Sequence, residues 1–117
     1  MPELSSTEKV REGLTAALDR KASAVLVFNL TELTTMTDYF VLSTASSDRQ
    51  AHAIADAIVE KLGNALSVEG LEAANWILMD YGDVVFHIFR EEARRFYALE
   101  RLWGDAENET GRFAASS

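Results

Sequence analysis

Carboxylates and large aromatic side chains gather between residues 69 and 87, and they could support recognition of another molecule. Glu69, Asp80 and Asp83 supply negative charge, and Trp76 supplies a large indole surface. Carboxylates form strong, charge-assisted hydrogen bonds with Lys and Arg. Tryptophan is enriched among the residues that dominate binding at protein interfaces. One interpretation is therefore a surface that binds a basic protein.

The same residues also have a structural interpretation. Tryptophan is mostly buried in folded proteins, so Trp76 could lie in a core or in a dimer interface. Asp80 and Asp83 flank Tyr81-Gly82, and aspartates favour turns because their side chains hydrogen-bond nearby backbone. The residues alone leave both interpretations open.

Neither a metal site nor a catalytic centre is indicated. Asp83 and His87 provide too few ligands for a metal, and His87 is interpreted as a partly buried histidine with satisfied hydrogen bonds. Nucleotidyl transfer needs a glycine-serine turn and carboxylates that hold Mg²⁺ against phosphates. The turn Thr44–Ser47 lacks glycine, and no Asp-x-Asp or Asp-x-Glu pair occurs in Trp76–Tyr81 or Val84–Phe89. We expect no catalytic residues, no cofactor and no metal.

Composition narrows the class of partner. The chain has 117 residues, 48% of them hydrophobic, which suits one domain with one core. Its 19 acidic and 11 basic residues give a net charge of -8, which disfavours free-standing binding to DNA or RNA and favours basic protein surfaces. No long apolar run, no signal peptide and no cysteine are present, so we expect a cytoplasmic protein with no membrane partner.

The elements that position these residues follow from periodicity and capping patterns. The pattern predicts helices, strands and a flexible C-terminal tail: a helix over 6–20, strands over 24–28 and 39–44, a helix over 47–62, a short strand near 66–68, hairpin strands over 76–81 and 84–89, a helix over 91–103, and the tail over 104–117. The order α-β-β-α-β-β-β-α predicts an α+β fold in which helices cover a mixed sheet, with residues 1–103 as the single domain.

Six motifs occur in an order and spacing that resemble the ribosomal silencing factor (Iojap-like) family over roughly Leu4 to Trp103. They are Thr37–Leu42, Ser46–Gln50, Val68–Gly70, Trp76, Asp80–His87 and Arg95–Trp103. The chain departs from the family pattern at Asn29, where Asp is frequent, and at Ala45, where Gly is frequent.

The resemblance implies a truncated nucleotidyltransferase fold without established activity. It also implies binding to the large ribosomal subunit through ribosomal protein L-fourteen, a block on joining with the small subunit and repression of translation. A homodimer off the ribosome and a minor contact with ribosomal RNA are further expectations. The resemblance favours the binding interpretation, so Glu69, Trp76, Asp80, Tyr81 and Asp83 are assigned to contact the ribosomal protein. A degenerate nucleotidyltransferase-like enzyme and a pure oligomerisation module remain as alternatives.

Overall fold

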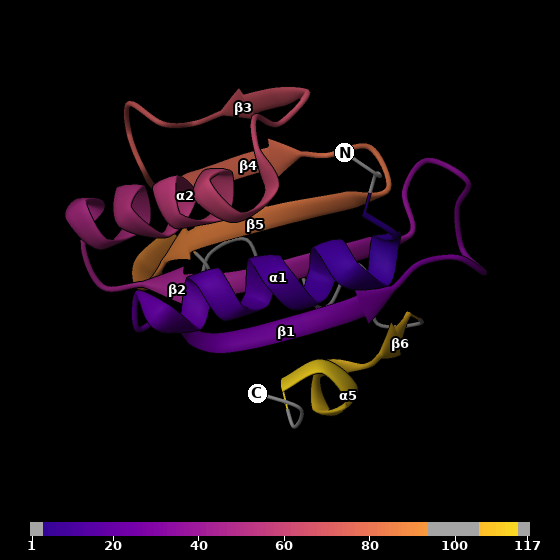
Figure 1. Ribbon diagram of the computed structural model, residues 1–117. Coiled ribbons are helices and arrows are strands. Elements are labelled where there is room, and N and C mark those ends of the chain that lie inside the picture. The colour runs from indigo at the N-terminus through magenta and orange to yellow at the C-terminus, as the bar shows by residue number, and fades with distance from the viewer. Residues whose placement is uncertain (1–3, 94–105, 115–117) are drawn as a thin grey trace.

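Two long helices cover one face of a six-stranded β-sheet (Figure 1). The computed structural model describes residues 4–93 and 106–114. The elements in chain order are α1 (Ser6–Asp19), β1 (Ser23–Asn29), β2 (Tyr39–Ala45), α2 (Asp48–Leu62), β3 (Ser67–Glu69), β4 (Trp76–Asp80), β5 (Val84–Arg90), β6 (Glu107–Asn108) and α5 (Thr110–Ala114). Within the described ranges, no helix is long and apolar enough to cross a bilayer.

Both long helices are capped at their N-termini by the serines that the sequence predicts, Ser5 and Ser47. The Ser5 side chain accepts a hydrogen bond from the Glu8 backbone N–H at 3.2 Å, and the Glu8 carboxylate accepts one from the Ser5 N–H at 3.0 Å. Ser47 accepts from the Gln50 N–H at 3.1 Å, and Gly63 closes α2 with a positive φ of 83°. These caps satisfy backbone groups that a helix end leaves free, so the helix boundaries follow local sequence closely.

The strand order is β3-β4-β5-β2-β1-β6, which confirms the predicted mixed sheet. Strands β2 and β5 pair in parallel, and the other neighbours pair antiparallel. The connection between β2 and β5 includes α2, which packs on the same face as α1 (Figure 1). Strands β4 and β5 form the hairpin predicted around Gly82-Asp83.

Alternation along the strands gives the sheet two apolar faces. On the helix side, Val41, Ile77 and Phe86 belong to the larger core with α1 and α2. On the opposite side, a smaller cluster forms around Phe89 and contains Phe28, Leu30 and Leu42, with Trp76 packed against it. Because both faces are apolar, the strands are rich in consecutive hydrophobic residues rather than alternating ones.

The C-terminal segment differs from the flexible tail expected after residue 104. Within it, β6 pairs with β1, and the Thr110 hydroxyl accepts a hydrogen bond from the Val27 N–H at 2.9 Å. Phe113 is only 2% exposed and packs edge-on against Tyr39. A single buried aromatic residue in a polar stretch produces no periodic pattern. The polar composition of this segment therefore suggested a flexible tail. Residues 91–93 are helical, and the remainder of the helix predicted over 91–103 lies outside the described residues.

Gly13 allows α1 to approach the sheet closely. A Cβ at this position would collide with the Phe86 ring, which is buried. We expect Gly13→Ala to destabilise the fold by about 1–3 kcal/mol, since overpacking of this ring outweighs the gain of about 1 kcal/mol in helix propensity. Urea unfolding measures the change. Gly111→Ala is the matched control, because a Cβ there meets nothing within 4 Å, and an equal loss in both variants would contradict the packing argument.

Candidate functional site

The five residues assigned to partner binding lie on two different sides of the sheet. Trp76, Leu78 and Asp80 alternate along β4 and therefore share a face, the one opposite α1 and α2. Glu69 pairs directly with Leu78 across the antiparallel β3–β4 ladder, so it points to the same side. The structure thus brings Glu69, Trp76 and Asp80 together on one face.

Tyr81 and Asp83 instead tie the hairpin turn to the helix side. Tyr81 is 8% exposed, and its hydroxyl donates a hydrogen bond to the Gly63 carbonyl at 2.7 Å. Burial raises the pKa of the Tyr81 hydroxyl further above neutral pH, where an ordinary tyrosine is already a donor. The Asp83 carboxylate forms an ion pair with Lys9 of α1 at 2.7 Å. These contacts orient the turn, and a direct role in partner binding remains a prediction.

Tyr81→Phe tests this supporting role. Loss of one hydrogen bond to the Gly63 carbonyl should destabilise the fold by about 1 kcal/mol while the ring stays in place. Urea unfolding would show the lower free energy of unfolding, and binding of the folded variant to the partner that the resemblance implies should be unchanged. A variant with native stability and lost binding would instead make the Tyr81 hydroxyl a direct contact.

Trp76 is held in a fixed orientation by His87 and Phe89. Its indole Nε1–H donates a hydrogen bond to His87 Nδ1 at 3.0 Å, and its ring stacks on Phe89 with centroids 5.1 Å apart. Trp76 is half-buried, so part of its surface remains available to a partner. An indole restrained in this way loses little side-chain entropy when it binds.

His87 is more buried and less satisfied than the sequence suggested. It is 3% exposed, and burial lowers its pKa to about 4, so the ring is neutral at pH 7. Because an indole N–H can only donate, His87 Nδ1 is the acceptor and Nε2 carries the proton. That Nε2 has no hydrogen-bond partner in the structure described here, which corrects the expectation of a fully satisfied histidine.

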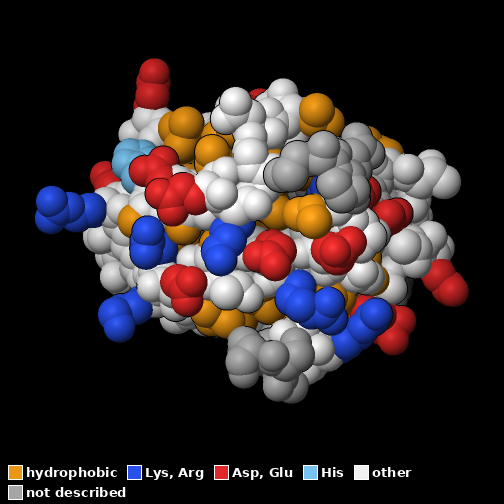
Figure 2. Space-filling view, viewed as in Figure 1, with side chains coloured by type: hydrophobic (Ala, Val, Ile, Leu, Met, Phe, Trp, Pro, Cys, Tyr) orange, Lys and Arg blue, Asp and Glu red, His pale blue; other side chains and the backbone are white. Residues whose placement is uncertain are grey.

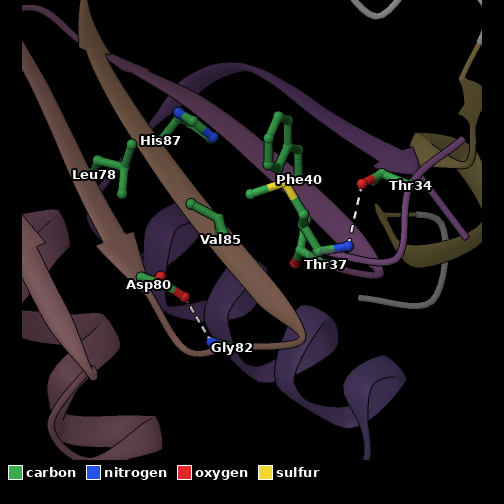
Figure 3. A pocket seen from close by; sticks show the side chains of 9 residues that line it. Thr34, Thr37, Phe40, Leu78, Asp80, Gly82, Val85 and His87 are labelled. Carbon is green, nitrogen blue, oxygen red and sulfur yellow. Dashed lines mark hydrogen bonds between the residues drawn. The ribbon is translucent and has the colours of Figure 1, made fainter.

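A cavity of about 270 Å³ adjoins His87 on the same face (Figure 3). Its lining comes from the loop before β2, from β2, β4 and β5, and from the hairpin turn: Thr34, Met36, Thr37, Phe40, Leu78, Asp80, Gly82, Val85 and His87. Sequence reasoning missed this cavity, because its walls come from segments more than thirty residues apart. The only local signal was the run of polar residues before β2.

Charge on the helix-bearing side is mixed. Figure 2 shows Lys, Arg, Asp and Glu side chains interspersed over this side, with no large area of one sign. Arg90 on β5 pairs with Asp48 at 2.7 Å, so its charge is engaged within the fold. Within residues 4–93 and 106–114, no group of three His, Cys, Asp or Glu side chains could hold a metal ion.

Comparison with known proteins agrees with this architecture. The family described as "Ribosomal silencing factor during starvation" matches residues 3–116. The ribosomal silencing factor of Halalkalibacterium halodurans is 36% identical over 107 residues, which cover 88% of this chain and 92% of that protein. A mouse protein named "Mitochondrial assembly of ribosomal large subunit protein 1" is 34% identical over 74 residues. These residues cover 57% of this chain and 32% of the mouse protein.

A crystal structure of a Chromobacterium violaceum protein superposes with a TM-score of 0.83 at 30% identity, covering 86% of this chain and 88% of that one. The shared fold therefore includes the mixed sheet and the helices that cover it. With a family match that spans residues 3–116, this chain belongs to the ribosomal silencing factor (RsfS) family.

Proposed function

We propose that this protein is a cytoplasmic, non-catalytic regulator that binds the large ribosomal subunit through ribosomal protein L-fourteen. Bound there, it blocks joining with the small subunit and so represses translation. Family membership supports a role at the ribosome. The observation that carries the proposal is that Trp76, Glu69 and Asp80 share the sheet face opposite the helices.

Trp76 supplies the anchor of the proposed contact. Interface hot spots are typically large side chains that are already well packed and that meet a partner pocket. The stacking on Phe89 and the hydrogen bond to His87 provide that packing before any partner arrives. The indole can therefore present a rigid apolar surface to a ribosomal protein.

Acidic side chains attract the basic partner and help to orient it on the sheet face. Glu69 is exposed, and no ion pair of Asp80 is found among the described residues. The chain carries a net charge of -8, and opposite charges speed encounters with a basic ribosomal surface. Tyr81 and Asp83 stabilise the adjacent turn through the Gly63 carbonyl and Lys9.

Two further expectations belong to this proposal. A homodimer off the ribosome is favoured by exposed apolar side chains on and beside the edge strand β3, namely Leu66, Val68 and Leu71. A minor contact with ribosomal RNA would need arginines other than Arg90, which is paired with Asp48. The likeness to a truncated nucleotidyltransferase fold remains a prediction.

Sedimentation with purified subunits tests the proposal. The protein should co-sediment with isolated large subunits and not with small subunits, and its addition should reduce the formation of joined ribosomes. An oligomerisation module would form dimers without binding to subunits, and a nucleotidyltransferase-like enzyme would bind nucleotides in a titration. Absence of large-subunit binding at low ionic strength would reject the proposed function.

A further inference from the structure

We propose that the cavity between β2, β4 and β5 receives one lysine or arginine side chain of the protein partner, with Asp80 as its counter-ion. This inference deepens the proposed function and rests on it for the identity of the partner. It assigns to the cavity a basic side chain rather than an apolar one. Three features of the lining support this choice.

The first feature is an apolar wall of suitable shape for an alkyl stem. Phe40, Leu78 and Val85 come from three adjacent strands and line the cavity from the sheet side (Figure 3). Lys and Arg cover apolar surface with their methylene groups while the charged head reaches a polar site. A volume of about 270 Å³ accommodates one such side chain rather than a large ligand.

The second feature is an unneutralised carboxylate in the lining. Asp80 accepts a hydrogen bond from the Gly82 N–H at 2.7 Å, which fixes its orientation, and it has no ion pair within the described ranges. Among residues 4–93 and 106–114, it is the only carboxylate that lines the cavity. His87 does not oppose it with positive charge, because burial holds the pKa of that ring at about 4. The cavity therefore has a net negative charge at pH 7.

The third feature is an unpartnered hydroxyl in the same lining. Thr37 is 8% exposed, and its Oγ1 lacks a hydrogen-bond partner in the part of the chain that the structure describes. A hydroxyl oxygen can accept from an ammonium or guanidinium N–H. An apolar guest would leave Thr37 Oγ1 without a hydrogen-bond partner and Asp80 without a counter-ion, and this favours a basic guest.

Asp80→Asn tests the charge requirement on the ribosome. The amide oxygen can still accept from the Gly82 N–H, so the turn should keep its shape. We expect affinity for isolated large subunits to fall about tenfold, with a weaker dependence on salt. Asp56→Asn is the matched control, because it changes net charge equally at an exposed position on α2. Equal affinity for Asp80→Asn and Asp56→Asn would overturn the proposal.

A second measurement separates this inference from the proposed function. The ¹⁵N-labelled chain is titrated with the Nα-acetyl amides of lysine and arginine, and with Nα-acetyl-norleucine amide as an uncharged control. The basic amides should shift the backbone resonances of Thr37 and Gly82, and Asp80→Asn should abolish these shifts. Equal shifts with norleucine, or none with the basic amides, would reject the cavity as a basic side-chain site even if the protein binds subunits. Shifts without subunit binding would reject only the proposed function.

Discussion

Trp76→Ala is expected to weaken binding to isolated large ribosomal subunits at least about thirtyfold, equivalent to about 2 kcal/mol. The substitution removes the half-buried indole, its stacking on Phe89 and its hydrogen bond to His87 Nδ1. The loss should appear mainly as faster dissociation, since anchors affect residence time more than encounter. Binding of labelled protein to subunits at several concentrations measures it.

Two variants separate an anchor from a structural residue. Trp76→Phe keeps an aromatic ring over Phe89 but cannot donate to His87, so it should retain part of the affinity. Ile77 is the next residue of β4 and faces the helix side. Ile77→Val should lower the free energy of unfolding by about 0.5–1.5 kcal/mol. Ile77→Val should bind normally. If folded Trp76→Ala also binds as the native protein does, Trp76 is a core residue and the proposed contact is wrong.

Most of the fold could be predicted because its signals are local. The caps at Ser5 and Ser47 and the turn at Gly82 each depend on a few neighbouring residues, and the observed boundaries lie within a residue or two of the expected ones. The segment over 106–114 could not be predicted, because its structure depends on β1 and α1 rather than on its own periodicity. Phe113 becomes ordered only by packing in a core that the rest of the chain builds.

The candidate site was predictable only in part. Residue type identified Trp76 and the acidic residues, but strand register decides which of them share a face. Glu69 joins Trp76 and Asp80 because β3 pairs with β4 in a register that places Glu69 opposite Leu78. Asp83 is engaged by Lys9, which is 74 residues away in the sequence. Local sequence patterns do not predict contacts between residues that are so far apart in the chain.

His87 offers the second large effect, in the pH dependence of stability. Its pKa falls from an ordinary value of 6.5 to about 4 in the folded protein, because burial disfavours the charged ring. Between these two pKa values the unfolded chain binds more protons than the folded one, so acid favours unfolding. The neutral ring's contribution is fully present above about pH 6.5 and is lost as pH falls toward 4, by about 3 kcal/mol.

Urea unfolding at intervals from pH 7.5 to pH 4 compares the native protein with His87→Gln. The glutamine has no titratable group and retains an oxygen that can accept from the Trp76 indole N–H. Carboxylates contribute equally to both proteins, so the difference between the two profiles isolates the histidine. His52→Gln on α2 removes the other histidine and leaves His87 in place, so it controls for the loss of a histidine as such. A native-like slope in His87→Gln would show that this ring is already free to take up a proton in the folded state, contrary to its burial between Phe40 and Phe89.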